Sequence, residues 1–334
     1  MCVSRSFLLA AFFLQGADAL AADRSIKAAP AVTMLPAVCV RSEPSPGTPE
    51  VPGGDIFGML SPSDIGDPCS LSYAAEITGR TGKRDGRYVA TTKKSQLTYT
   101  HSQQLSFAAS PFVSAFQWKD VGGNHDALKG AGAGVERSSL NTVDFDGVSF
   151  EASWRVLSRS LQQPLAVTLS TEPRWFRRDA ITGYRADSGQ VELKLFADIA
   201  LSEHWFVAVN ANYGFGTQRL KIPRAELQKG SAYGVATALT FQAWKDETAA
   251  VQAVFIGVEA RYVQGFSGLT LNFRVGEALF AGPTLAIAFK GGSMLNLVWS
   301  PQLGGHAWPP SAPGPLDCDN FERHQFRIKF ATPL

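Results

Sequence analysis

The sequence predicts an all-β fold, an antiparallel transmembrane β-barrel of about twelve strands (roughly 10–14) with short periplasmic turns and long outer loops. Three observations support this prediction. Apolar and polar residues alternate along repeated segments, short turns between these segments alternate with long loops, and aromatic residues cluster near the segment ends. The composition agrees, because only 18% of the 334 residues are charged, against about a quarter in soluble domains. The net charge of +2 excludes the concentrated basic field of a general nucleic-acid binder.

Residues 1–21 have the pattern of a cleaved secretory signal peptide. Arg5 supplies the positive charge, residues 7–14 form a short apolar core, and residues 19–21 (Ala-Leu-Ala) form a small-residue cleavage site. A membrane-spanning helix is the other interpretation, but the apolar run is too short for one. We therefore expect secretion of the remaining chain.

Residues 22–68 are rich in proline and glycine, and such a composition cannot bury a core. We expect an extended or disordered periplasmic leader here. Cys39 lies within it and Cys69 directly follows it, so a disulfide bond between them would tie the leader to the first strand. Two free thiols are the alternative, because sequence does not give the distance between the sulfurs.

The barrel is expected over residues 69–334, where the apolar period is two. In the segment 190–201, for example, Leu193 and Leu195 fall on one face, while Glu192 and Lys194 fall on the other. A helix would scatter these charges over both faces. Twelve such segments are predicted, at residues 70–79, 88–101, 104–119, 144–157, 164–177, 189–201, 204–216, 231–244, 251–264, 278–290, 293–302 and 322–332.

The connections between the segments place the chain relative to a membrane. The long loops are expected at residues 120–143, 178–188, 217–230, 265–277 and 303–321. An even number of strands puts both termini and the short turns in the periplasm and the long loops outside the cell. A soluble β-sandwich and a lipocalin-like barrel are the competing folds, but sandwich strands are nearer five or six residues long.

Several motifs resemble those of an uncharacterised proteobacterial outer-membrane β-barrel family, over about residues 55–334. The matching segments are residues 55–58 (Asp-Ile-Phe-Gly), 63–66 (Ser-Asp-Ile-Gly), 78–88, 279–285 and 320–324. The resemblance implies a bacterial outer-membrane location and offers no activity to carry over. The amphipathic segment 323–330 also resembles the closing strand read by the barrel-assembly machinery, an expected partner, although the chain ends in Thr332-Pro333-Leu334 instead of an aromatic residue.

Charged residues on the polar face of the segments are expected to face the lumen. They are Glu76, Glu151, Arg155, Glu172, Arg174, Glu192, Lys194, Asp198, Glu259, Arg261, Arg327 and Lys329. In an open barrel these charges would select solutes, whereas in a plugged barrel they would pair and make the wall rigid. A barrel of about twelve strands is intermediate in bore, so both alternatives remain.

A basic hairpin brackets the first outer loop. Arg80, Lys83, Arg84 and Arg87 would suit the phosphates of outer-membrane lipopolysaccharide, because guanidinium pairs well with phosphate. A solvated turn built on Asp85-Gly86 is the alternative.

Other chemistry is not indicated. The histidines lack the spacing of a zinc site, the cysteines lack a CxxC pair, and no cofactor fingerprint is found, so we expect no metal and no cofactor. His101 and Ser102 are adjacent and would point to opposite faces of a strand, so no catalytic residues are assigned. The expected function is a narrow pore for small polar solutes or a structural role in the envelope. An outer-leaflet lipid-modifying enzyme and a soluble secreted β-domain that binds sugar or lipid are the alternatives.

Overall fold

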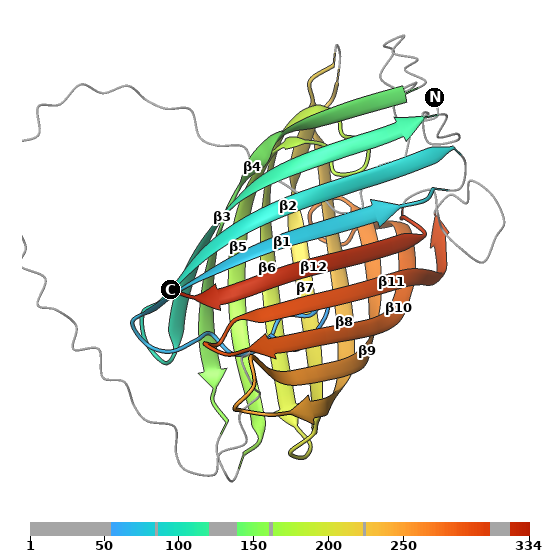
Figure 1. Cartoon of the computed structure of the whole chain (residues 1–334). Coiled ribbons are helices and arrows are strands. Elements are labelled where there is room, and N and C mark those ends of the chain that lie inside the picture. The colour runs from blue at the N-terminus through green and yellow to red at the C-terminus, as the bar shows by residue number, and fades with distance from the viewer. Residues whose placement is uncertain (1–54, 84–85, 120–138, 160–162, 223–224, 308–320) are drawn as a thin grey trace, which may run out of the picture.

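The computed structural model describes residues 55–83, 86–119, 139–159, 163–222, 225–307 and 321–334. These residues form a closed antiparallel barrel of twelve strands, in which each strand pairs with its sequence neighbours and β1 closes on β12 (Figure 1). The predicted all-β barrel is therefore confirmed. Among the described residues, no helix is long and apolar enough to cross a membrane.

The strand bounds follow the predicted segments closely. They are β1 Ser70–Thr81, β2 Arg87–Thr100, β3 Leu105–Lys119, β4 Ser139–Leu157, β5 Leu165–Arg178, β6 Arg185–Ala200, β7 Trp205–Leu220, β8 Gln228–Lys245, β9 Val251–Ser267, β10 Phe273–Phe289, β11 Met294–Ala307 and β12 His324–Pro333. Several strands extend further toward the long loops than predicted: β10 starts at Phe273 instead of 278, and β11 continues to Ala307 instead of 302.

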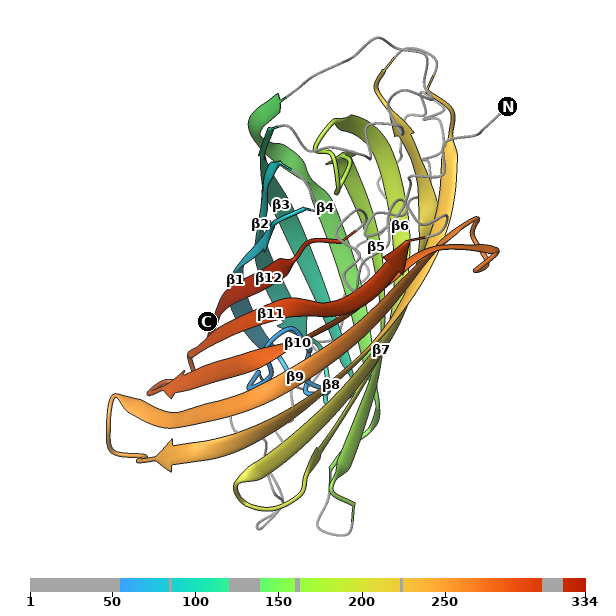
Figure 2. The same ribbon diagram turned by 90° about the vertical axis from the view of Figure 1, so that its right-hand side faces the viewer.

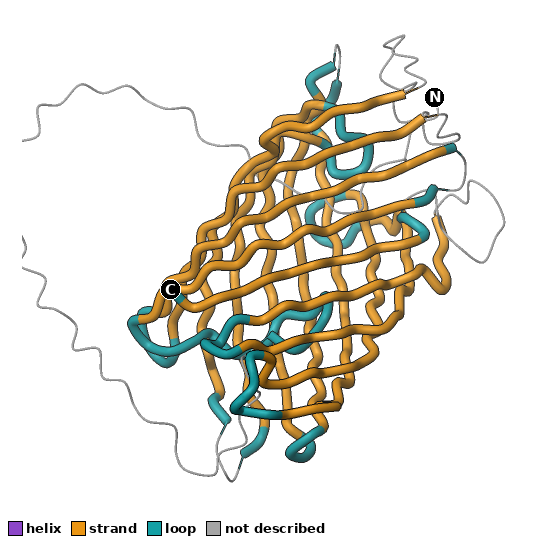
Figure 3. Tube along the Cα trace, viewed as in Figure 1, coloured by secondary structure: helices purple, strands orange, loops and turns teal. Residues whose placement is uncertain are grey.

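The two ends of the barrel differ. One end, called the turn end, carries the short turns, the start of β1 and the C-terminus, where the Leu334 amide N–H donates to the Leu71 carbonyl at 2.9 Å. The other end, called the loop end, carries the long connections, and Figure 3 shows loops only at these two ends and inside the barrel. Because the strands extend, three of the predicted long loops are shorter than predicted, and these connections span residues 179–184, 221–227 and 268–272.

Alternation along the strands sorts side chains between outside and lumen. In β6, Leu193 and Leu195 point outward and are 47% and 37% exposed, while Phe196 and Asp198 point inward and are buried. The predicted facing of this strand is therefore observed, and the same pattern recurs around the barrel.

A bulge in β4 interrupts the alternation. The pairing of β3 with β4 shifts between Phe112 and Val113, so that Asp146 and Glu151 both face the lumen although they are five positions apart, a spacing that would put them on opposite faces of a regular strand. Gly147 is required at the bulge, because a Cβ there would lie 1.8 Å from the Trp175 carbonyl oxygen. The strand starts at Ser139, five residues before the predicted start at 144.

Residues 55–67, which we call the plug, lie inside the barrel near the turn end (Figure 2). Ile56, Phe57 and Leu60 are fully buried against a wall surface lined with alanines, at positions 200, 208, 236, 238, 253 and 286. The small alanine side chains leave the space that the plug fills. The expectation of a periplasmic leader over 22–68 is thus corrected for its last part, since this segment carries enough apolar side chains to be buried.

Candidate functional site

The lumen holds three layers from the turn end to the loop end. The plug is the first. The second is a group of charged side chains, called the belt, which consists of Lys94, Glu151, Glu172, Arg174, Glu192 and Lys194. The third is a cavity at the loop end. The belt and the lining of the cavity come largely from side chains that alternate inward along the strands.

Carboxylates of the wall bind amide groups of the plug. The Met59 N–H donates to both oxygens of Glu259 on β9, at 2.9 and 2.8 Å. The Ser63 N–H donates to Asp198 on β6 at 2.6 Å. Both carboxylates are nearly fully buried. They therefore act as acceptors for plug backbone that has no secondary-structure partner.

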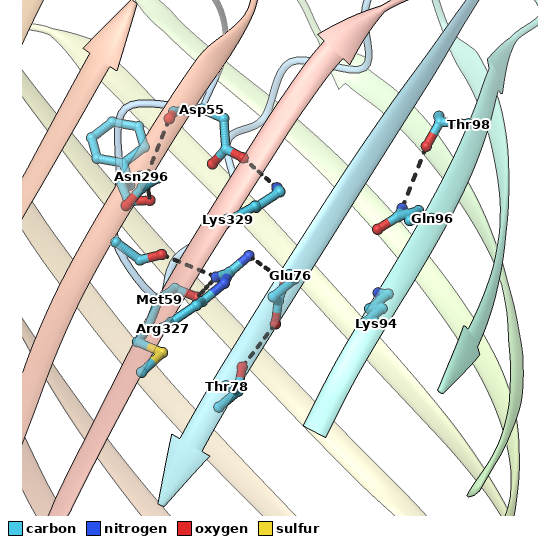
Figure 4. A network of polar contacts seen from close by, with 12 residues as sticks. Asp55, Met59, Glu76, Thr78, Lys94, Gln96, Thr98, Asn296, Arg327 and Lys329 are labelled. Carbon is cyan, nitrogen blue, oxygen red and sulfur yellow. Dashed lines mark hydrogen bonds and ion pairs between the residues drawn. The ribbon is translucent and has the colours of Figure 1, made fainter. Parts of the chain in front are cut away.

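Wall side chains also donate to carbonyl groups of the plug. Asn296 on β11 donates to the Asp55 and Phe57 carbonyls, and Arg327 on β12 donates to the carbonyls of residues 58 and 59 at 3.0 and 3.1 Å (Figure 4). Three further donors are Asn210 to the Ser61 carbonyl, Thr168 to the Ser63 carbonyl and Thr100 to the Ile65 carbonyl, at 3.0, 2.6 and 2.6 Å. Counting both kinds of contact, seven strands around the barrel bind the plug backbone.

Ion pairs complete these contacts. Lys329 pairs with Asp55 at the start of the plug, and Arg155 pairs with Asp64 near its end. Arg327 also pairs with Glu76 on β1 at 2.8 Å (Figure 4). A buried polar group without a partner costs about 1–3 kcal/mol of folding stability. The wall side chains avoid this cost because they bind the polar groups of the plug along its path.

The belt crosses the lumen on the loop-end side of the plug. Its centre is Glu172, which is 0% exposed and contacts Lys194, Arg174 at 2.5 Å and Lys94 at 3.8 Å. Lys194 also binds Glu151 at 3.1 Å, and Arg174 binds Glu192 at 2.5 Å. The alternating signs hold together side chains of β2, β4, β5 and β6.

Two cavities lie on either side of the belt. The cavity next to the plug has a volume of about 460 Å³ and reaches Lys94, Glu151 and Lys194. The loop-end cavity has a volume of about 390 Å³ and reaches Arg174 and Glu192. The two cavities share no lining residue, and Glu172 lines neither. The belt thus lies between the two cavities, with side chains that reach both of them.

The β5–β6 connection folds inward at the loop end. Arg80 donates to the Ala180 carbonyl at 2.6 Å, Tyr88 to the Ile181 carbonyl at 2.9 Å and Trp118 to the Thr182 carbonyl at 2.9 Å. This connection therefore lies against β1, β2 and β3 and narrows the loop end.

Glu322, just before β12, anchors the same region. Its carboxylate binds Arg80 at 3.2 Å and Lys83 at 3.8 Å. Burial alone would raise the pKa of Glu322, but the two cations outweigh it and hold that pKa below its usual range.

The predicted lipopolysaccharide contacts need correction. Arg80 and Lys83 are buried and bound to Glu322, and Lys83 also lies 5.1 Å from the centre of the Tyr88 ring, so neither presents a charge to a lipid surface. Arg84 lies outside the described residues, and Arg87 is exposed at the start of β2. The sequence pattern did not show that an inward-folded loop and Glu322 would take these cations.

All twelve predicted lumen residues point into the barrel, and most fall into two groups. Arg155, Asp198, Glu259, Arg327 and Lys329 bind the plug, while Glu151, Glu172, Arg174, Glu192 and Lys194 belong to the belt. Glu76 binds Arg327, and Arg261 lines the loop-end cavity. Lys94 of the belt and the plug-binding Asn210 and Asn296 are not among the predicted lumen residues. Alternation in β2 places Lys94 inward, so that signal was available for Lys94.

The remaining expectations concern the termini and other chemistry. Cys69 is disulfide-bonded, but Cys39 and the predicted signal peptide lie outside the described residues. His101 and Ser102 lie in the β2–β3 turn at the turn end. No group of three metal-binding side chains occurs in the described part of the chain.

Comparison with solved structures places this architecture among outer-membrane barrels. A COG4313 outer-membrane channel from Pseudomonas putida F1 is 13% identical, with a TM-score of 0.50 over 85% of this chain and 100% of that chain. The NanC porin is 8% identical, with a TM-score of 0.42 over 78% of this chain and 100% of that chain. The translocator domain of autotransporter NalP from Neisseria meningitidis is 11% identical, with a TM-score of 0.45 over 79% and 88%. Of these three, the first alone reaches a TM-score of 0.5, and that likeness concerns the fold.

Sequence comparison gives the family. No curated protein matches this chain. A model described as "Family of unknown function (DUF6662)" matches residues 49–333, which include the plug and all twelve strands. The chain therefore belongs to this family of unknown function, DUF6662.

Proposed function

We propose that this protein is an integral outer-membrane barrel that acts as a narrow channel for small polar solutes and is closed at rest by its own plug. The turn end would face the periplasm and the loop end the outside. Solutes would pass only when the plug moves away from the wall.

The outward surface supports the membrane location. Apolar side chains cover it around the barrel, and Ile256 and Val258 on β9 are 50% and 59% exposed. Monomeric soluble proteins rarely expose a continuous apolar patch of more than a few hundred Å². A lipid environment would bury these side chains, whereas the alternative of a soluble secreted β-domain would leave them in water.

The contact between plug and wall carries the proposal. Seven strands bind the plug backbone through hydrogen bonds, and two ion pairs hold its ends. These contacts are non-covalent, and the wall side chains that bind the plug backbone are polar and able to bind water in its place. The two cavities already offer polar and charged linings to a solute.

Gly58 offers a selective way to displace the plug. A Cβ at this position would lie 2.6 Å from Thr284 Cγ2, 2.8 Å from Glu259 Oε2 and 2.9 Å from Val298 Cβ. Gly58→Leu should therefore push the plug away from β9–β11 without changing any barrel strand. Met59→Leu is the matched control, because it keeps an apolar side chain of similar volume next to the same position.

Recordings in planar lipid bilayers test the proposal. The wild-type protein and Met59→Leu should be closed for most of the time, and Gly58→Leu should show frequent discrete openings. Each sample must first show the mobility shift between unheated and heated protein that a folded barrel gives. A folded Gly58→Leu barrel that stays silent, or a wild-type protein that is permanently open, would contradict the role of the plug.

A further inference from the structure

We propose that the loop-end cavity is a binding site for a small organic monocarboxylate with an apolar or aromatic body, and that Arg261 is the residue that binds the carboxylate. The inference concerns binding and does not depend on whether the barrel conducts.

One of the arginines around the cavity has no carboxylate partner. Four arginines and three carboxylates line it, namely Arg80, Arg174, Arg178 and Arg261 with Asp146, Glu192 and Glu322. Three of the arginines are neutralised by carboxylates: Arg80 binds Glu322, Arg174 binds Glu172 and Glu192, and Arg178 binds Asp144. Arg261 has no ion pair with any described carboxylate. Asp146 likewise has none with a described cation, and it accepts a hydrogen bond from the Ser114 hydroxyl at 2.6 Å.

The two carboxylates that act on Arg261 through space are occupied elsewhere. Glu259 accepts the Met59 N–H of the plug, and Glu322 binds Arg80 and Lys83. Arg261 itself donates one hydrogen bond, to the Gln325 side-chain oxygen. A guanidinium has five N–H donors, so Arg261 retains hydrogen-bonding capacity for a ligand.

Neighbouring residues hold Arg261 in place. Its guanidinium carbon lies 5.3 Å from the centre of the fully buried Phe280 ring, at a distance suited to a cation–π contact. Gln325 on β12 fixes it from another side. An arginine fixed in this way loses little conformational entropy when it binds a planar carboxylate.

The rest of the lining suits an apolar body. Val263 packs against the apolar cluster of Phe280 and Phe321 beside Arg261. On the side of β3 and β5, the ring centres of Phe112 and Phe176 lie 5.4 Å apart. Ala232 lines the same cavity and leaves space there. The volume of about 390 Å³ falls within the range of about 300–1,000 Å³ that is typical of small-molecule sites. One unpaired cation beside aromatic side chains fits an aromatic monocarboxylate better than a polyanion.

Equilibrium binding to the full-length, detergent-solubilised protein tests this inference. Benzoate is the probe, benzamide is the uncharged molecule of the same shape, and acetate is the carboxylate without a ring. Benzoate should bind, and benzamide and acetate should each bind at least tenfold more weakly. Equal binding of benzoate and benzamide, or no binding of benzoate, would overturn the proposal.

Two variants locate the site. Arg261→Gln should weaken benzoate binding at least tenfold and remove the preference over benzamide, while Arg87→Gln, at the exposed start of β2, should leave both unchanged. Ala232→Phe should block binding by filling the cavity without altering a charge, so it decides the question even if Arg261→Gln fails to fold. Undiminished benzoate binding in a folded Arg261→Gln or Ala232→Phe protein would place the ligand elsewhere.

Discussion

Lys194 in the belt should be much more important for stability than a surface lysine with an equally close partner. Lys194→Met removes the cation that binds both Glu172, which is fully buried, and Glu151 at 3.1 Å. Removing one partner of a buried ion pair lowers the folding stability by about 3–5 kcal/mol. Glu172 would keep Arg174 and Lys94, so we expect the lower end of that range.

Lys245→Met is the matched control. Lys245 binds Glu247 at 2.8 Å, but these side chains are 56% and 75% exposed in the β8–β9 turn, where water screens the pair. Urea unfolding in lipid vesicles, followed by the gel-mobility shift of unheated protein, should show a large loss of stability for Lys194→Met and no measurable loss for Lys245→Met. Adding Glu151→Gln to Lys194→Met should restore part of the loss, because it removes one unpaired charge. Equal stabilities of the two single variants would refute the description of the belt as a buried network.

Three further predictions follow from the barrel. Leu195→Arg, in the middle of the outward face of β6, should destabilise folding into vesicles by about 2–4 kcal/mol, whereas Leu201→Arg in the adjoining turn should fold nearly as well as wild type. Similar folding yields of the two variants would mean that β6 faces the other way. The Glu322 pKa is held below its usual range, so its pairs with Arg80 and Lys83 stabilise the fold fully at neutral pH. This contribution is lost as the pH falls through and below the ordinary glutamate pKa of about 4.3. Glu322→Gln should therefore be less stable than wild type at pH 7 and lose less stability on acidification, and parallel stability curves against pH would contradict this. The cavity linings carry acidic and basic groups in similar numbers, so the open state of Gly58→Leu should discriminate weakly between K⁺ and Cl⁻. If this variant, measured in a KCl gradient, gave the reversal potential of an ideally selective pore, the prediction would be wrong.

Sequence alternation predicted the barrel well because the facing of each strand residue is a local property. Leu195 and Lys194 are adjacent, and their opposite faces follow from the pleat alone. The same rule placed every predicted charge in the lumen. It failed at the β4 bulge, where one extra residue at Asp146 reverses the phase.

The contents of the lumen could not be predicted in the same way. Whether Lys194 meets Glu151 and Glu172 depends on how far the strands are staggered around the barrel, which no single segment reveals. The plug was hidden because proline and glycine dominate residues 22–68 as a whole. Within that segment, Ile56, Phe57 and Leu60 were the available signal, since a disordered leader has little need for such side chains.

The position of the plug is the central claim, and a disulfide cross-link tests it most directly. A Cβ at Gly58 would lie 2.9 Å from that of Val298 on β11, so a shift of about 1 Å brings the pair Gly58→Cys and Val298→Cys to the Cβ separation of about 3.5–4.5 Å found in disulfides. In the full-length protein, oxidised in native membranes and analysed by mass spectrometry, the two positions should appear in one cross-linked peptide, while Gly58→Cys paired with Val258→Cys on the outer surface should give none. Free thiols at both 58 and 298 in a folded barrel would contradict the account, because residue 58 would then not lie beside β11.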